Sequence, residues 1–322
     1  KKFASNVHKE NNFNVLKTAG IYGPNNAGKT CLIKCIKAIR QILLNHKPSL
    51  MSNIFTASSV CELGMTFLAF GRKFAYDFKY DVAEKEFIYE SFSEILKDQY
   101  GNEKEVFWLV KDSVQGRYFC ADEDAIQMMP LMAKNNLLCY LIDSSKFEHL
   151  AEMKRIIVDF AEKIDIINMN NIPMEHTIKL MKNKNQLQQK IVDFIKNADL
   201  YMDNFEYMDM DQIKLKTDDE EEKPDEKVLE LPETIMDQIR LVSTYKGVHV
   251  PSMLFDSTGT KKIAALAGYV IEGLEQGRIL VIDELDSSIH FKLTRAIVAM
   301  FNNELNTNAQ MIFTVHDINL MD

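Results

Sequence analysis

The chain has 322 residues, of which 46% are hydrophobic and 26% charged, a profile that excludes extensive disorder and fits one large domain or two ordinary ones. Asp and Glu outnumber Lys and Arg by 47 to 38, and the net charge of −9 argues against a general affinity for nucleic acid. No run approaches about 18 consecutive apolar residues, so we expect no membrane span.

Five cysteines are scattered along the chain without the spacing of a zinc site, and we expect reduced core thiols in a cytoplasmic protein. They are Cys31, Cys35, Cys61, Cys120 and Cys139. The chain has no signal-peptide pattern and begins Lys-Lys-Phe without Met, which is consistent with a fragment of a longer protein.

A glycine-rich loop over residues 23–30, with the sequence GPNNAGKT, follows a short apolar strand predicted over 18–22. Apolar residues at helical spacing predict a helix over 31–46. Two glycines let the backbone curl so that successive N–H groups face one anion, and the helix dipole favours that anion. Lys29 can reach β- and γ-phosphates, and Thr30 can offer its hydroxyl to Mg²⁺. The predicted phosphate-binding residues are Gly23, Asn25, Asn26, Ala27, Gly28, Lys29, Thr30 and Cys31.

The next region alternates apolar and polar residues with a period of two. Aromatic residues at 74, 76, 78 and 80 predict a strand, and neighbouring strands are expected over 65–70, 87–92 and 106–110. Turns are expected at Gly71-Arg72 and Gly101-Asn102. The pattern predicts an antiparallel meander.

From about residue 123 to 200 the period becomes helical. Ser145 and Glu148 have the spacing of a capping box. One predicted helix face then carries Leu150, Met153, Ile157, Phe160 and Ile164. A further helix is expected after Pro173, with Ile178, Met181, Leu187, Ile191 and Ile195 on one face. The acidic run at 218–222 is expected to be a solvated loop.

The last ninety or so residues again alternate strands and helices. A buried strand over 278–282 ends at Asp283-Glu284, and a helix is expected over 291–302. An acid at the tip of such a strand can hold Mg²⁺ through water, and a second acid can orient or deprotonate the attacking water. We therefore predict that Asp283 and Thr30 hold the Mg²⁺ ion and that Glu284 is a catalytic residue.

Two further segments have weaker signals. His316 follows a strand over 311–315 and could contact a γ-phosphate, although a lone histidine is more often structural. Ser257, Gly259 and Thr260 precede an apolar helix, where they could form a second anion site or a plain helix cap.

These motifs together resemble a known group. The chain resembles the ABC-type ATPase heads of the OLD (overcoming-lysogenization-defect) and abortive-infection group. These are relatives of RecF and SMC heads. The resemblance lies in the order of the motifs GPNNAGKT, SxGT, VIDELDSSIH and FTVHD, and in the aromatic strand from Tyr76 and the stretch at 88–91. The resemblance covers about residues 14–95 and 235–318.

The resemblance implies an α/β P-loop NTPase fold: an ABC-type head with an antiparallel β subdomain and an inserted helical region. We therefore expect a discontinuous head over 1–120 and 236–322, and a helical insertion over 121–235 with its acidic loop near 217–227. Lys29 and Thr30 resemble the Walker A pair, Asp283 the Walker B acid, Glu284 the catalytic glutamate and His316 the switch histidine.

The same resemblance makes Ser257, Gly259 and Thr260 a shortened signature motif, which would contact ATP bound by a second subunit. Leu285-Asp286 resembles the D-loop. The LSGGQ form of transporters is missing, a Gln loop is not identified, and the chain stops before any nuclease domain of the Toprim type.

The favoured interpretation is a cytoplasmic, Mg²⁺-dependent ATPase of an anti-phage, abortive-infection type defence system. It would pair its heads as a homo-oligomer and control a separate effector such as a nuclease. The alternative is a DNA-repair or chromosome-associated ATPase of RecF or SMC type, with a basic track that Lys179, Lys182, Lys184 and Lys190 could supply. A plain phosphotransferase or binding module would leave Ser257 and His316 unexplained.

Overall fold

The computed structural model describes residues 4–11, 13–24, 26–52, 57–183, 186–198, 201–208 and 232–316. The chain forms two compact units, and we describe each by itself. Unit 1 comprises Lys1–Leu16 and Asn25–Ile166, and unit 2 comprises Lys17–Pro24 and Ile167–Asp322. The acidic run at 218–222 and its expected loop near 217–227 lie outside the described residues.

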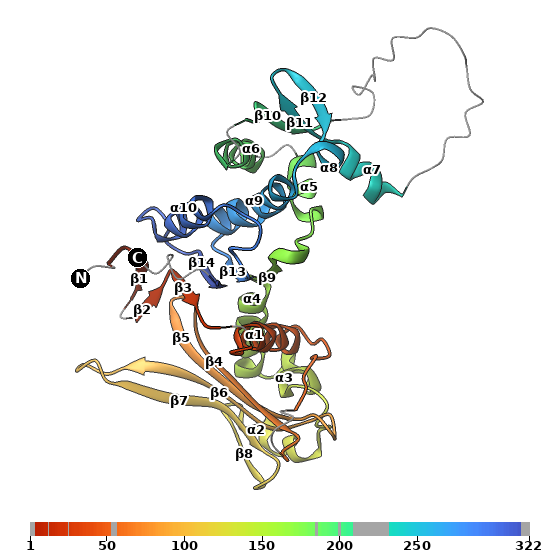
Figure 1. Ribbon diagram of the computed structural model, residues 1–322. Coiled ribbons are helices and arrows are strands. Elements are labelled where there is room, and N and C mark those ends of the chain that lie inside the picture. Colours follow the sequence, from red (N-terminus) through yellow and green to blue (C-terminus); the bar gives the residue numbers. More distant parts are fainter. Residues whose placement is uncertain are drawn as a thin grey trace. The chain divides into compact units, whose positions relative to one another are not determined.

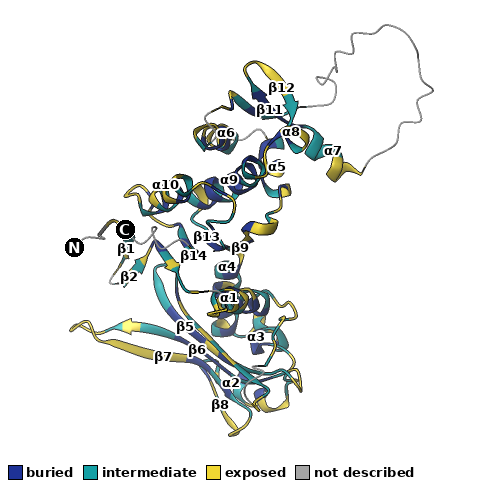
Figure 2. Cartoon of the chain, viewed as in Figure 1, coloured by how far each residue is buried: buried dark blue, intermediate teal, exposed yellow. Residues whose placement is uncertain are grey.

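Unit 1 is built on the predicted meander, a five-stranded antiparallel sheet in the order β4-β5-β6-β7-β8 (Figure 1). Phe74, Tyr76 and Phe78 of β5 are almost completely buried and Asp77 is exposed, as the alternation predicts, but Ala75 is buried too and Tyr80 is only partly buried. Figure 2 shows the same gradient, with buried segments in β5 and β6 and more exposure along β7. The strands are β4 Val60–Ala69, β5 Arg72–Asp81, β6 Glu86–Lys97, β7 Glu103–Asp112 and β8 Arg117–Cys120, beside the hairpin β1 Val7–Glu10 and β2 Phe13–Leu16.

Helices cover one face of this sheet and complete its core. Ile39 and Ile42 of α1 and Ile156 of α4 join the buried aromatic residues of the sheet in one cluster. The helix α1 ends where Asn45 adopts a positive φ and His46 N–H donates to the Gln41 carbonyl, a Schellman arrangement. The helices and 3-10 turns are η1 Ala4–Asn6, α1 Lys29–Leu43, α2 Glu123–Ile126, η2 Met129–Leu131, α3 Leu138–Leu141, η3 Ser144–Lys146 and α4 Glu148–Glu162.

The predicted capping box at Ser145 and Glu148 is wrong. Ser145 lies in η3, and the residue before α4 is Phe147, which makes no side-chain cap. The carboxylate of Asp122 instead accepts hydrogen bonds from the backbone N–H groups of His149 (3.2 Å) and Leu150 (2.9 Å). The cap therefore comes from a residue distant in sequence.

Unit 2 contains a four-stranded sheet in the order β3-β14-β13-β9, with β3, β14 and β13 parallel. Its strands are β3 Thr18–Ile21, β13 Ile279–Asp283, β14 Gln310–Thr314 and β9 Ile164–Asn168, of which only the last two residues belong to unit 2. Leu280, Val281 and Ile282 are fully buried, as expected for a strand covered on both faces. The helices α9 Thr258–Gln276 and α10 Phe291–Asn302 contribute Leu266, Ile297 and their neighbours to the same core. A parallel sheet places functional side chains at the carboxyl ends of its strands.

A second, three-stranded antiparallel sheet in the order β10-β11-β12 completes unit 2. Its strands are β10 Asn204–Tyr207, β11 Leu241–Tyr245 and β12 Val248–Pro251. The remaining helical elements are η4 Met169–Asn171, α5 Glu175–Lys182, α6 Gln186–Ala198, α7 Glu233–Ile239 and α8 Ser252–Phe255.

Several expectations for residues 121–235 need correction. Ile164 begins β9 rather than extending the preceding helix, and β10 also lies in the segment expected to be helical. The single helix expected after Pro173 is two helices, α5 and α6. The assignment of 1–120 and 236–322 to a nucleotide-binding head stays a prediction.

The structure also bears on the expected absence of a membrane span and on the state of the cysteines. Among the described residues, no helix has the length and hydropathy needed to cross a membrane. All five cysteines are free thiols, but only Cys120 and Cys139 are core residues, and Cys31 is exposed. Burial raises the pKa of the Cys120 thiol to about 11.

Candidate functional site

The glycine loop presents its backbone to solvent. Gly28, the residue before α1, has a φ of 90°, a left-handed conformation that costs glycine little. No side-chain cap forms at this helix end, and the N–H groups of the first turn point away from the helix toward the loop. Asn26, Ala27, Thr30 and Cys31 are exposed. Such a loop ahead of a helix N-terminus is suited to bind an anion.

The predicted residues of the glycine loop do not all lie in the same unit. Gly23 follows β3 and belongs to unit 2, whereas Lys29 and Thr30 begin α1 in unit 1. Asn25 lies outside the described residues.

The acid Asp283 is the last residue of β13 and only 3% of it is exposed. Thr314, at the end of β14, donates a hydrogen bond of 2.7 Å from Oγ1 to Asp283 Oδ1. The same hydroxyl accepts the backbone N–H of Glu284 at 2.7 Å. Thr314 therefore joins two neighbouring strand ends and fixes the position of both acids.

Glu284 leaves the strand with a positive φ of 57°, which is uncommon for a residue with a side chain. The contact from its N–H to Thr314 and the bond from Leu285 N–H to the Thr314 carbonyl (3.0 Å) hold this conformation. Backbone strain of this kind is concentrated at functional sites. Because of the positive φ, the Glu284 side chain leaves the backbone in a different direction from that of a residue in a continued strand.

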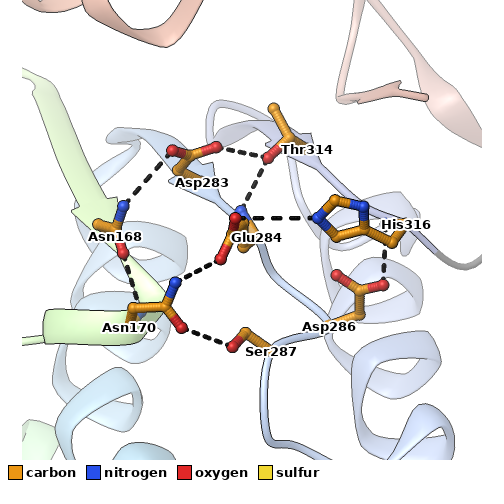
Figure 3. A network of polar contacts seen from close by, with 8 residues as sticks. All are labelled: Asn168, Asn170, Asp283, Glu284, Asp286, Ser287, Thr314 and His316. Carbon is orange, nitrogen blue, oxygen red and sulfur yellow. Dashed lines mark hydrogen bonds and ion pairs between the residues drawn. The ribbon is translucent and has the colours of Figure 1, made fainter. Parts of the chain in front are cut away.

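Two asparagines that the sequence analysis did not identify complete the cluster (Figure 3). Asn168, the last residue of β9, donates from Nδ2 to Asp283 Oδ2 at 3.4 Å. Asn170, in η4, donates from Nδ2 to Glu284 Oε2 at 2.5 Å and accepts from Ser287 Oγ at 2.8 Å. The sequence carried only a weak signal for them, because the segment Ile-Asp-Ile-Ile at 164–167 contains a charged residue and does not read as a buried strand.

His316 also lies at this cluster, and its predicted contact with a γ-phosphate stays a prediction. Its Nε2 lies 3.8 Å from Glu284 Oε1, and its backbone N–H donates to Asp286 Oδ2 at 2.9 Å. Figure 3 shows the imidazole on the side of Glu284 opposite to Asn170. A histidine there can contact a group that Glu284 also faces.

The segment of Ser257, Gly259 and Thr260 begins α9. Ser257 is the N-cap, and its Oγ accepts the Thr260 N–H at 3.1 Å, so the plain capping role is present. A Cβ at Gly259 would lie 3.3 Å from the Ser288 carbonyl oxygen, a tight contact that shows how closely the two backbones approach. The start of α9 thus packs against the loop that follows Glu284.

The donor atoms around Asp283 fit a hard divalent cation such as Mg²⁺. A carboxylate has about four lone-pair positions, and Thr314 and Asn168 occupy only part of them. In the described part of the chain, no cluster of three or more His, Cys, Asp or Glu side chains could form a complete metal cage. Mg²⁺ commonly takes one or two carboxylates, with phosphates and water as its other ligands.

The structure therefore brings together Asp283, Glu284, His316 and, through the loop at 285–288, the segment at 257–260. These residues all belong to unit 2. Lys29 and Thr30 belong to unit 1, so the meeting of the glycine loop with the two acids stays a prediction.

Comparison with known proteins places these observations in a family. A model of the family described as "AAA domain, putative AbiEii toxin, Type IV TA system" matches residues 161–322, half of the chain. The matched region contains both acids, both asparagines and His316. No curated protein matches significantly.

Solved structures of SMC heads are similar in fold. An SMC head bound to the C-terminal winged-helix domain of ScpA has a TM-score of 0.50 and 12% identity, over 96% of this chain and 86% of that chain. The SMC head domain from Thermotoga maritima has a TM-score of 0.39 and 13% identity, over 98% and 89% of the two chains. The chain has the fold of an ABC-type P-loop ATPase head and belongs to the AAA-domain family of the AbiEii type.

Proposed function

We propose that this chain is the ATP-hydrolysing head of an OLD-like, abortive-infection type anti-phage defence system. The observation that carries the proposal is the polar cluster at the ends of β9, β13 and β14. In it, two consecutive acids have separate partners: Asp283 contacts Thr314 and Asn168, and Glu284 contacts Asn170 and faces His316. A metal-side acid beside a general base is the arrangement that nucleotide hydrolysis needs.

The nucleotide would bind at the glycine loop. The exposed amides after Gly28 suit the phosphates, and Lys29 would neutralise the β- and γ-phosphate charge. Mg²⁺, when bound, would compensate phosphate charge during the reaction. Thr30 and Asp283 are the residues that would hold it.

Hydrolysis requires a water molecule to be oriented toward the γ-phosphate. Glu284 is 30% exposed at its side chain, so water can reach a carboxylate that is nevertheless held in place. We assign it as the residue that accepts the proton of that water. His316, whose Nε2 faces Glu284 Oε1, would donate a hydrogen bond to the phosphate oxygens.

Head pairing would complete the site. Ser257, Gly259 and Thr260 at the start of α9 would contact the γ-phosphate held by a second copy of the chain. ATP would then favour the paired state because neither surface alone satisfies the phosphate charge, and hydrolysis would release it. The link to defence rests on the AbiEii description of the family and on the motif resemblance, and the controlled effector would be a separate protein such as a nuclease.

The structure gives less support to a DNA-directed role. Two of the four lysines of the suggested basic track form ion pairs, Lys182 with Asp237 and Lys190 with Glu275, each at 2.6 Å. Lys184 lies outside the described residues. DNA-stimulated, salt-sensitive hydrolysis would favour the RecF or SMC interpretation instead.

Nucleotide binding can be tested by thermal shift. ATP with Mg²⁺ at 100 times its dissociation constant should stabilise the protein by about 2.7 kcal/mol. Lys29→Ala should abolish this shift, whereas Lys34→Ala, on the exposed side of the same helix, should retain it. An equal shift in both variants would contradict the assigned site.

Hydrolysis, pairing and defence need separate measurements. Glu284→Gln should bind ATP but accumulate as a stable pair, visible by light scattering, because hydrolysis no longer releases it. Phage resistance of the host should be lost with Lys29→Ala. A host that keeps full resistance would overturn the defence role while leaving the ATPase assignment open to its own test.

A further inference from the structure

The side-chain amide of Asn170 bridges Glu284 and the loop that follows it. Its Nδ2 donates to Glu284 Oε2 at 2.5 Å, and its Oδ1 accepts from Ser287 Oγ at 2.8 Å. The three residues come from η4, from the end of β13 and from the next loop (Figure 3). The contact spans 114 positions of the chain between Asn170 and Glu284.

The hydrogen-bond partners fix the orientation of this amide. An ionised carboxylate only accepts hydrogen bonds, so the NH₂ group of Asn170 must face Glu284. The carbonyl oxygen is then the group that faces the Ser287 hydroxyl, which donates to it. The opposite orientation would place two acceptors against each other at Glu284.

The backbone of Asn170 is held as well. Its N–H donates to Asn168 Oδ1 at 2.9 Å, which ties η4 to the end of β9. Asn168 uses its own NH₂ group for Asp283. Two asparagines in one short segment therefore hold two consecutive acids, one each.

The hydrogen bond from Asn170 makes the two carboxylate oxygens of Glu284 different from each other. The backbone of Glu284 is fixed by Thr314, but a glutamate side chain still has three rotatable bonds. The bond from Asn170 occupies Oε2 and removes most of that freedom. Oε1 is left on the side of His316, 3.8 Å from its Nε2.

We infer that Asn170 is the positioning residue that holds Glu284 with Oε1 as the oxygen that accepts the proton of the attacking water, and that Ser287 fixes the orientation of Asn170. This inference rests on the proposed function, because it names a residue that acts through Glu284. Asn170 itself contacts neither the nucleotide nor the water in this assignment.

A purely structural role for Asn170 fits the structure less well. The residue is exposed, and its side-chain hydrogen bonds run to Glu284 and Ser287, both outside the hydrophobic core. Surface residues of this kind usually change stability little when truncated. Its removal should therefore act on turnover rather than on folding.

Steady-state hydrolysis of ATP tests the inference. Asn170→Ala should lower kcat by roughly ten- to hundredfold, because a catalytic group displaced by about 1 Å loses that much rate. The KM for ATP, the thermal shift by ATP and the melting temperature without nucleotide should stay near the wild-type values. Asn170→Gln keeps the amide donor and should recover part of kcat. The matched control is Asn171→Ala, the exposed next residue of η4, which should retain full kcat.

A double-mutant cycle tests the role of Ser287. Ser287→Ala should lower kcat less than Asn170→Ala does, and it should have no further effect in the Asn170→Ala background. Independent, multiplicative effects on kcat would overturn the assignment of Ser287.

The outcomes separate the inference from the proposed function. If the wild-type protein hydrolyses ATP and Glu284→Gln abolishes the reaction, but Asn170→Ala keeps full kcat, the inference fails alone. A loss of kcat in Asn170→Ala that parallels a loss of thermal stability would overturn it too. If the wild-type protein binds and hydrolyses no ATP, the proposed function fails, and the inference fails with it.

Discussion

Thr314 and Asp283 lie 31 positions apart in the chain, and the hydroxyl of Thr314 donates a 2.7 Å hydrogen bond to Asp283 Oδ1. Both residues end parallel strands, and both are buried. Because the same hydroxyl accepts the Glu284 N–H, one threonine positions both Asp283 and Glu284, the proposed metal-side acid and general base.

Thr314→Val removes this hydroxyl at nearly constant volume. The Asp283 carboxylate and the Glu284 N–H then each lose a buried partner, and we expect a loss of about 1–3 kcal/mol in the free energy of unfolding. ATP hydrolysis should fall as well, because the position of Glu284 is released. Urea unfolding and turnover assays measure both effects, and Thr314→Ser, which keeps the hydroxyl, is the control. Equal stability of the two variants would show that the hydroxyl contributes little.

Asp256 anchors the start of α9 through three hydroxyl groups. Its buried carboxylate accepts from Ser243 Oγ and Ser252 Oγ at 2.6 Å and from Tyr245 OH at 2.9 Å. Asp256→Asn replaces one acceptor oxygen by a donor group, and we expect about 1–3 kcal/mol of destabilisation by urea unfolding. Tyr245→Phe breaks one of the three bonds and should cost less. The reverse order would contradict the anchoring role.

The carboxylate Glu90 is buried in unit 1, where Tyr76 OH donates to it at 2.8 Å and Leu138 N–H at 3.0 Å. Burial raises the pKa of Glu90, and the charge of Lys111 and the two hydrogen bonds act in the opposite direction by favouring the ionised form. Tyr76→Phe should therefore lower the free energy of unfolding at neutral pH by about 1–3 kcal/mol. Tyr80→Phe, on the same strand, makes no hydrogen bond to Glu90 and should change stability by less.

His176 and Glu272 join α5 to α9, with Nε2 and Oε2 3.0 Å apart. The imidazole of His176 beside it lowers the pKa of Glu272 below its ordinary value of 4.5. A carboxyl with a lowered folded-state pKa adds stability above the unfolded-state pKa and loses it as the pH falls through the folded-state pKa. The stability difference between wild type and Glu272→Gln should therefore shrink as the pH falls below about 4.5.

Urea unfolding across this pH range measures the effect. Glu275→Gln is the control on the same helix, since Glu275 pairs with Lys190 at the surface and such pairs contribute little. If the stability difference between wild type and Glu272→Gln does not shrink between pH 4.5 and about pH 3, the contact between Glu272 and His176 is not its source.

The sequence by itself determined the elements whose patterns are local. The alternating aromatics of β5 predict a half-buried strand, and the apolar run before Asp283 predicts a fully buried one, because both patterns follow from the period of a strand. The glycine loop and the helix α1 were equally readable, since GxxxxGK[ST] encodes its own backbone geometry. Lys29, Asp283 and Glu284 were predicted as site residues from such patterns, and His316 mainly from the family resemblance.

Only the tertiary structure decided which side chains contact them. The strand β9 was missed because Ile164 continues the helical spacing of the preceding segment and Asp165 interrupts its apolar residues, and with it Asn168 and Asn170 were missed. The cap of α4 comes from Asp122, more than 20 positions away, where no local motif can indicate it. Hydrogen bonds between strand ends depend on strand order, and strand order is set by how the whole sheet packs, so the partners of Asp283 and Glu284 appear only in the folded chain.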